Sequence, residues 1–349
     1  MEIKKFTDVD LNDSFFDSLK ESYQEFEDWF NRKAESDDEA YVQYDQNSNL
    51  VGFLYLKIED GTLDNVTPPR GDCKRLKVGT FKVTPHGTRF GERFIKKIMD
   101  KAIVENVDEI YLTIFDEHDA LITLLQKYGF SNDEDCTKES DNGTEKVLIK
   151  KMREVSDDIC LDYPLIQTEN KRKFALSIYP RFHTKLFPDS ILNNENYNLI
   201  QDISHTNSIH KIYVCYMRGV EQLIPGDILA IYRTTDGQGP AHYRSLISSL
   251  CVVEEIRTGR DFRDLDEFIN YANRYSVFER NELTTLYNNP NVVVIKMTYN
   301  TALRHRVIKQ QLMDDLNINP EYWGFFRLTD EQFDGLLELG EVYENIIIN

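Results

Sequence analysis

The segment from Lys77 to Met99 constrains the fold of this 349-residue chain more than any other part of it. It reads KVGTFKVTPHGTRFGERFIKKIM, in which a strand pattern runs through a short turn into apolar residues at helical spacing. Unpaired backbone N–H groups at such a helix N-terminus attract anions, and Gly87 and Gly91 would let a phosphate approach the backbone closely. The segment therefore fits a pyrophosphate, although a purely structural turn has the same local pattern.

The flanking segments predict an ordered series of elements around this turn. The apolar periodicities indicate helices, a β-hairpin, a strand, a helix, a strand, a helix and a final strand. These elements are expected at 12–33, 40–44 with 50–59, 75–83, from 90 to 103, 109–115, 120–127 and 146–152.

This order, with the segment HDALITLLQKYGF after the strand 109–115, resembles the GNAT N-acetyltransferase superfamily over residues 1–155. The resemblance implies a mixed sheet with flanking helices that binds acetyl-CoA and transfers its acetyl group to an amine. In that family, the strand before the turn pairs through its backbone with the pantetheine arm, and the turn binds the pyrophosphate. The cofactor-binding residues implied are Phe81, Lys82, Val83, His86, Gly87, Thr88, Arg89, Phe90, Gly91, Glu92 and His118.

The turn departs from the family pattern at two positions. His86 stands where the family usually has Gln or Arg, and Arg89 stands where it has Gly. The connection from Val83 into the turn is also shorter than usual, which would shift the cofactor. Arg89 could compensate by pairing with phosphate, because guanidinium binds phosphate oxygens well.

The family pattern is also changed where the acid of the reaction is expected. His118 and Leu125 replace a common Asn and a Tyr that often protonates the departing thiolate. Tyr128 is the candidate acid in its place, and Glu59 at the end of a strand is the candidate base. A missing base would not exclude activity, because alignment of the amine and polarisation of the thioester carbonyl do most of the work.

The second half is richer in strand patterns, which are expected at 174–178, 210–217, 227–232, 246–255 and 291–299. Its strongest local signal is Gly226-Asp227 opening the strand ILAIYR. The order resembles a PUA-like domain of the ASCH or EVE kind over residues 160–349, which implies a mixed β-barrel with helical insertions. The whole chain is then of the α+β class.

PUA-like domains often recognise RNA or a modified base through a cleft with aromatic and basic groups. A further basic group, Arg304 to Arg306 with Lys309, is expected on a helix, where a solvated face is the usual explanation. The candidate nucleic-acid-binding residues are Arg181, His183, Lys185, Tyr232, Arg233, His242, Tyr243 and Arg244.

Composition excludes several classes of function. A net charge of −19 excludes a uniformly basic surface that coats nucleic acid, although a local basic groove stays possible. The five cysteines have no CxxC spacing, and neither HExxH nor GxSxG occurs, so the sequence indicates no metal site, disulfide framework or serine hydrolase. Without a long apolar run or a signal segment, a cytoplasmic protein with no membrane partner is expected.

Two interpretations of function remain open, and a third is weaker. The first is an N-acetyltransferase whose PUA-like half presents RNA or a nucleotide-linked amine to acetyl-CoA. The second is a regulatory sensor that binds acyl-CoA without turnover and recognises nucleic acid or a partner. The third is a hydrolase of modified nucleosides, for which the sequence offers no convincing nucleophile. Oligomeric state is not determined at this level.

Overall fold

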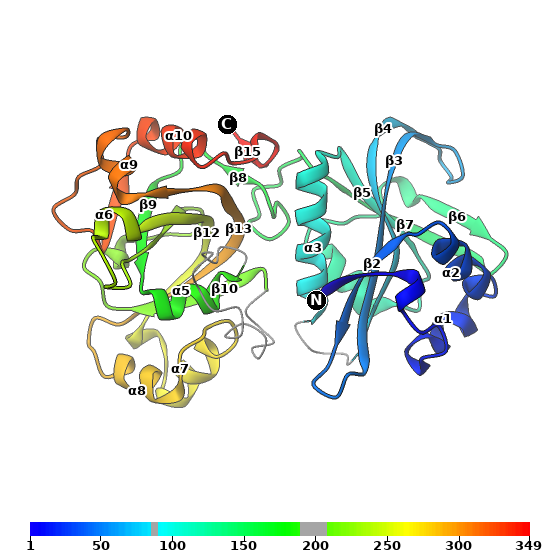
Figure 1. Ribbon diagram of the computed structural model, residues 1–349, viewed down its shortest axis with the longest axis horizontal. Helices are drawn as coiled ribbons and strands as arrows, with labels where there is room; N and C mark the ends of the chain where they lie inside the picture. Colours follow the sequence, from blue (N-terminus) through cyan, green and yellow to red (C-terminus); the bar gives the residue numbers. More distant parts are fainter. Residues whose placement is uncertain (85–89, 189–207) are drawn as a thin grey trace. The chain divides into compact units, whose positions relative to one another are not determined.

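The computed structural model describes residues 1–84, 90–188 and 208–349 (Figure 1). The chain divides into two compact units, Met1–Glu154 and Val155–Asn349. Four predicted cofactor-binding residues, His86, Gly87, Thr88 and Arg89, lie outside the described residues. No helix in the described ranges is long and apolar enough to cross a membrane.

The first unit is built on a seven-stranded sheet in the order β1-β2-β3-β4-β5-β7-β6. Neighbouring strands are antiparallel except β4 and β5, which run parallel. The strands are β1 (Glu2–Lys5), β2 (Glu39–Tyr44), β3 (Leu50–Leu63), β4 (Arg70–Val83), β5 (Glu109–Ile114), β6 (Thr137–Ser140) and β7 (Gly143–Lys151).

Helices cover both faces of this sheet: α1 (Asp17–Ser22), α2 (Phe26–Glu35), α3 (Phe90–Glu105) and α4 (Asp119–Gln126). Phe81 stacks on Phe94 of α3 with ring centroids 5.7 Å apart, while the Lys82 ammonium donates to the Phe15 carbonyl. Because consecutive strand residues point to opposite faces, α3 and the N-terminal aromatic segment lie on opposite sides of β4. The aromatic stripe of that segment packs into the core, where Phe16 meets Phe53 of β3 edge-on at 5.3 Å.

The second unit contains a six-stranded mixed sheet in the order β10-β13-β12-β11-β9-β14. Among the described strands of this sheet, β9 and β11 pair in parallel and the other neighbours are antiparallel, while β8 (Ile166–Gln167) pairs separately, also in parallel, with β15 (Ile347–Ile348). The sheet strands are β9 (Lys173–Ile178), β10 (His210–Cys215), β11 (Ile228–Arg233), β12 (Leu246–Thr258), β13 (Val293–Ile308) and β14 (Phe325–Leu328). Within the described ranges, β10 and β14 do not pair, so these six strands form a mixed sheet with no closed barrel, in place of the predicted mixed β-barrel.

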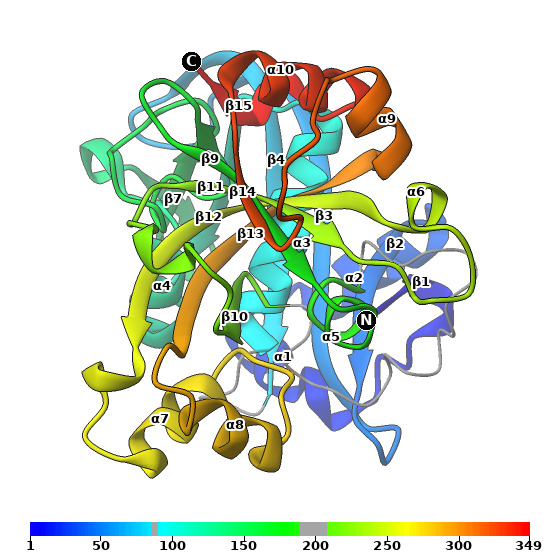
Figure 2. The ribbon, with the colours of Figure 1, turned by 90° about the vertical axis from the view of Figure 1, so that its left-hand side faces the viewer.

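Helices are inserted between these strands, as Figure 2 shows, with α7 and α8 at one end of the unit and α9 and α10 at the other. They are α5 (Pro180–Leu186), α6 (Ala241–Arg244), α7 (Leu265–Ala272), α8 (Arg280–Tyr287), α9 (Lys309–Asp314) and α10 (Asp330–Leu339). The helix predicted for the basic group Arg304 to Arg306 is wrong, because β13 continues through these residues and α9 begins only at Lys309.

The Gly226-Asp227 signal has a clear local cause. Gly226 adopts φ +90°, a left-handed conformation that favours glycine. Asp227, the next residue, is buried with 2% of its surface exposed. The Asp227 carboxylate accepts from Arg172 Nε at 2.9 Å and Nη2 at 2.5 Å, and from the Ile224 N–H at 2.9 Å. This buried carboxylate therefore ties the start of β11 to the residue that precedes β9.

Asp227→Ala is expected to destabilise the second unit by about 2 to 4 kcal/mol, because it leaves Arg172 and the Ile224 N–H without their shared acceptor. The matched control is Asp236→Ala, which breaks the half-buried bidentate pair between Asp236 and Arg244; it should cost less, because both of these side chains still reach solvent. Urea unfolding followed through Trp323 in a Trp29→Phe background measures both. Equal losses for the two variants would contradict the role given to Asp227.

Candidate functional site

The central feature of the first unit is the short pairing between β4 and β5. Only Arg75, Leu76 and Lys77 pair with β5, opposite Glu109, Ile110 and Tyr111. Beyond Lys77, β4 continues along β3 and β5 continues along β7. Within the described part of the chain, the two strands have no further pairing, so their facing backbone edges are open.

A β-bulge lies where the two strands part. Tyr55 of β3 faces Thr80 and Leu56 faces Val78, so Gly79 is an extra residue in β4 without an opposite residue. A Cβ at Gly79 would lie 2.7 Å from Tyr55 Cδ1, which explains the glycine. Bulges redirect backbone groups out of the ladder. This bulge was not predicted from the sequence, although a glycine inside a strand pattern is the usual signal of one.

The next residues of β4 present their backbone to the open edge. The Thr84 N–H donates to the Val51 carbonyl of β3 at 2.8 Å. Because an antiparallel ladder alternates, the N–H and C=O groups of Phe81 and Val83 point away from β3. Lys82 differs: its ammonium contacts Ser18 Oγ at 2.5 Å, and burial lowers its pKa.

At the start of α3, the predicted phosphate-binding residues have structural contacts of their own. A Cβ at Gly91 would lie 2.5 Å from Leu124 Cδ2, so this glycine lets α3 and α4 approach each other. Glu92 is buried, and its Oε1 lies 3.1 Å from Lys127 Nζ. Phe90 is the first residue of α3, and the exposed His118 is the residue that precedes α4.

Glu59, the candidate base, lies beside the last pair between β4 and β5. Tyr111 Oη donates to Glu59 Oε2 at 2.5 Å, and Lys57 and Lys77 lie 3.0 and 3.9 Å from Oε1. Burial raises the pKa of Glu59, but these partners outweigh it and hold the pKa below its usual range. Glu59 is therefore an ionised carboxylate near the point where the strands diverge.

Tyr128, the candidate acid, is fully buried just after α4. Its hydroxyl accepts a hydrogen bond from Lys127 Nζ at 3.3 Å. The structure therefore gives Tyr128 a packing role, and its catalytic role stays a prediction.

In the second unit, His183 is the most unusual of the predicted nucleic-acid-binding residues. It is 0% exposed, and its Nε2 lies 2.7 Å from Ser248 Oγ. Its Nδ1 is buried without a hydrogen-bond partner among the described residues. Burial, reinforced by the charges of Arg233 and Arg306, lowers the pKa of His183 to about 3. The imidazole is therefore neutral at physiological pH.

The other predicted residues divide into two groups. Tyr232 and Arg233 of β11 are buried, and Arg233 Nη1 donates to the Arg244 carbonyl at 3.3 Å. The remaining five stay partly or fully at the surface, where Arg181 pairs with Glu282 at 3.2 Å and Arg244 pairs with Asp236. Those five are Arg181, Lys185, His242, Tyr243 and Arg244.

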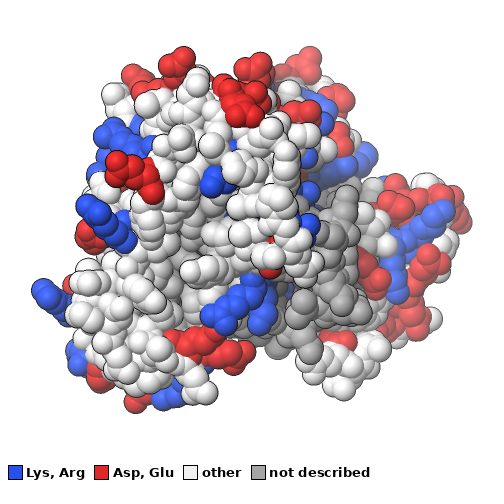
Figure 3. All heavy atoms as spheres, turned by 60° about the vertical axis from the view of Figure 1, so that its left-hand side comes forward, with Lys and Arg blue, Asp and Glu red and all other residues white. Residues whose placement is uncertain are grey.

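Several groups that the sequence analysis did not select lie in this unit. Lys309 Nζ lies over the Trp323 ring, 4.1 Å from its centroid. The ring centroids of Trp323 and Tyr232 are 5.4 Å apart. Three strongly exposed tyrosines also belong to it, Tyr179, Tyr216 and Tyr322, in addition to the predicted Tyr243. In the view of Figure 3, basic side chains lie in small groups next to acidic ones, and the described residues form no continuous basic field on the face drawn.

The pKa of His183 predicts a pH dependence of stability. Unfolded histidine has a pKa of about 6.5, so protons bind the unfolded chain more tightly than the native one. This contribution is complete above about pH 6.5 and is lost as the pH falls towards 3. Between about pH 7.5 and 5.5, the wild type should lose about 1 kcal/mol more than His183→Gln, which keeps an amide near Ser248. Urea unfolding at both pH values measures this difference, and equal losses would contradict a neutral buried imidazole.

No protein-family model matches this chain, and no curated protein matches it. ASCH from Zymomonas mobilis is similar at 11% identity over 48% of this chain and 94% of that chain, with a TM-score of 0.34. PaiA N-acetyltransferase from Thermoplasma acidophilum, in complex with coenzyme A, is similar at 16% identity over 43% of this chain and 99% of that chain, with a TM-score of 0.28. The NatC complex bound to Gag peptide and CoA is similar at 22% identity over 43% of this chain and 99% of that chain, with a TM-score of 0.29. Similarities this weak assign neither a family nor an activity.

Proposed function

We propose that the first unit is an N-acyltransferase that binds an acyl-CoA thioester, with acetyl-CoA as the first candidate, and transfers the acyl group to an amine. The observation that carries this proposal is the open edge of β4 beyond its short pairing with β5. Phe81 and Val83 direct backbone donors and acceptors into that opening, where the amides of a pantetheine arm would pair like an added strand. The residues present thus fit the cofactor.

The remaining groups suit the chemistry of acyl transfer. The thioester supplies an electrophilic carbonyl carbon, and a backbone N–H freed by the bulge at Gly79 would polarise that carbonyl. The ionised Glu59 would accept the proton that the attacking amine loses. The start of α3, at Phe90 and Gly91, would favour the negatively charged pyrophosphate.

For the acceptor, we propose RNA or a nucleotide-linked amine recognised by the second unit. The exposed tyrosines and the Trp323–Lys309 pair offer faces on which bases would stack. The buried Arg233 and the half-buried Arg306 add positive charge near the neutral His183. This local basic group is compatible with a chain whose net charge is −19.

A second candidate is a sensor that binds acyl-CoA without turnover. Two observations favour it: Leu125 stands where the related enzymes often have a proton-donating tyrosine, and both Leu125 and Tyr128 are 0% exposed. A buried hydroxyl would not reach a departing thiolate. Turnover separates the two candidates, whereas binding of acyl-CoA is common to both.

Val83→Pro should weaken acetyl-CoA binding by about 5- to 100-fold, because proline removes one backbone donor from the open edge. The Val83 N–H points away from β3, so the ladder between β3 and β4 should survive. Calorimetric titration of the purified chain measures the affinity. The matched control is Val83→Ala, which keeps the N–H and should bind nearly as tightly as the wild type. Equal affinities for Val83→Pro and Val83→Ala would contradict backbone pairing at this edge.

For the acceptor, the double variant Tyr179→Ala/Tyr322→Ala should bind a fluorescent single-stranded RNA at least about 5-fold more weakly, since each base stacked on an aromatic ring contributes about 1 to 3 kcal/mol. Anisotropy titrations at two salt concentrations give the affinity and its salt dependence. If the wild type binds no RNA while it acetylates a small amine, the RNA part of the proposal fails and the acyltransferase part stands.

A further inference from the structure

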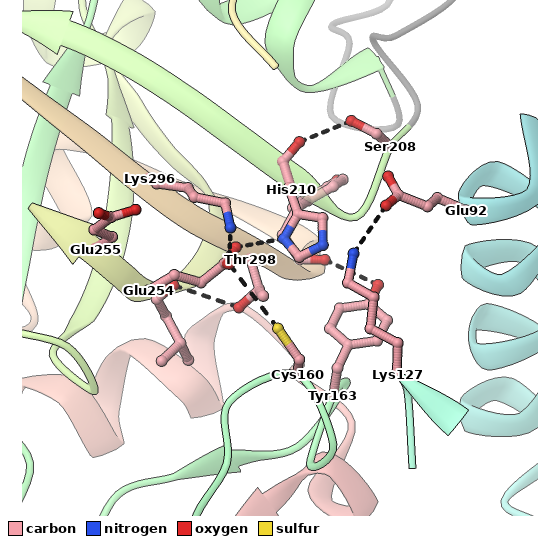
Figure 4. A network of polar contacts seen from close by, with 12 residues as sticks. Glu92, Lys127, Cys160, Tyr163, Ser208, His210, Glu254, Glu255, Lys296 and Thr298 are labelled. Carbon is pink, nitrogen blue, oxygen red and sulfur yellow. Dashed lines mark hydrogen bonds and ion pairs between the residues drawn. The ribbon is translucent and has the colours of Figure 1, made fainter. Parts of the chain in front are cut away.

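A cluster of metal-ligating side chains lies in the second unit, apart from the residues used in the proposed function. Cys160, His210 and Glu254 each offer one donor atom, and these three atoms all lie within 4.8 Å of one another (Figure 4). The residues come from three separate segments: the turn before β8, the first position of β10, and β12. The sequence alone shows no ligand motif here, because the fold brings together positions that are distant along the chain.

The cluster is held in place by its surroundings. His210 is 1% exposed and the Glu254 side chain is 8% exposed. His210 Nδ1 lies 2.5 Å from Glu254 Oε1, and Cys160 Sγ lies 4.0 Å from Glu254 Oε2. The turn that carries Cys160 is fixed by its N–H, which donates to Asp158 Oδ1 at 2.9 Å. A buried carboxylate needs a positive partner, and a cation shared by these three donor atoms could serve as that partner as well as an ammonium group does.

We propose that Cys160, His210 and Glu254 form a three-ligand site for a zinc-type divalent cation. Thiolate, imidazole and carboxylate are the ligands that Zn²⁺ takes in proteins, and three protein ligands leave a fourth position open. Tetrahedral bonds of about 2.0 to 2.3 Å place donor atoms about 3.3 to 3.6 Å apart. If Glu254 Oε1 is its donor atom, the contact with His210 Nδ1 at 2.5 Å would therefore open by about 1 Å on binding. On binding, the thiol would release its proton.

Lys296 is the group that competes with such a cation. Its Nζ lies 2.6 Å from Glu254 Oε2, and its side chain is 25% exposed. Lys296 thus neutralises the carboxylate, and a divalent ion would take its place while the ammonium swings into solvent. If the cluster is a cation site, removal of this positive charge should strengthen metal binding, whereas a purely structural ion pair would gain no metal affinity from it.

The test uses the purified full chain, freed of affinity tag and treated with chelator. With Co²⁺ as the spectroscopic probe, the wild type should bind one equivalent and show a sulfur-to-cobalt charge-transfer band. Zn²⁺ added to the Co²⁺-loaded chain should abolish that band. The affinity for Zn²⁺ is measured separately, by competition with a chromophoric chelator. Cys160→Ser should remove the band and weaken Zn²⁺ binding by more than about 100-fold, because loss of even a supporting residue costs about 10- to 100-fold.

Two further variants make the result specific. Cys73→Ser alters the other half-buried cysteine and should leave the Co²⁺ spectrum and the Zn²⁺ affinity unchanged. Lys296→Met should bind Zn²⁺ at least about 10-fold more tightly than the wild type. A wild-type chain without the charge-transfer band overturns the proposal, and this result needs no variant to fold. Cys160→Ser binding as tightly as the wild type, or Lys296→Met without any gain, overturns it as well.

Discussion

The short parallel pairing between β4 and β5 is the contact on which the first unit depends. It joins the antiparallel strands β1 to β4 to the strands β5 to β7, and it ends at Lys77 opposite Tyr111. Since each strand then follows a different neighbour, the backbone edge of β4 stays open along Phe81 and Val83. Glu59 stands opposite Arg75, within this pairing, and the bulge at Gly79 follows two residues after its end. This one topological feature therefore positions the open edge and the candidate base that the acyl-transfer proposal uses.

In the second unit, several buried charged side chains each have a partner of opposite charge. Asp227 is compensated by Arg172, Glu254 by His210 and Lys296, and Lys173 by Asp330 at 2.5 Å. His183 is treated differently: it is buried near positive rather than negative groups and becomes neutral. A neutral histidine with its Nδ1 unpartnered among the described residues is a buried polar group that costs stability.

Much of the local structure could be predicted because it depends on short-range chemistry. The hairpin before residue 60, the helix from Phe90 and the strand 109–115 follow from apolar periodicity, and Gly226-Asp227 identified a turn that needs a left-handed residue. The predictions that were wrong, the helix at Arg306 and the barrel, depend on which strands pair over long distances in the sequence. Arg306 lies on β13 because that strand continues along β12, and no local pattern reveals that continuation. Whether a sheet closes into a barrel is likewise decided by its edges.

The sequence by itself determined the α+β class, the order of the elements before and after residues 85–89, and the residue types available for catalysis and binding. The tertiary structure decided which of those residues can act. It brought Glu59 to the point where β4 and β5 part, buried Tyr128, gave Gly91 a packing contact with Leu124, and gathered Cys160, His210 and Glu254. The physical reason is the distance along the sequence over which each kind of interaction acts. Helix and strand periodicity depends on neighbours a few residues apart, whereas burial and donor geometry depend on contacts between segments that only the folded chain brings together.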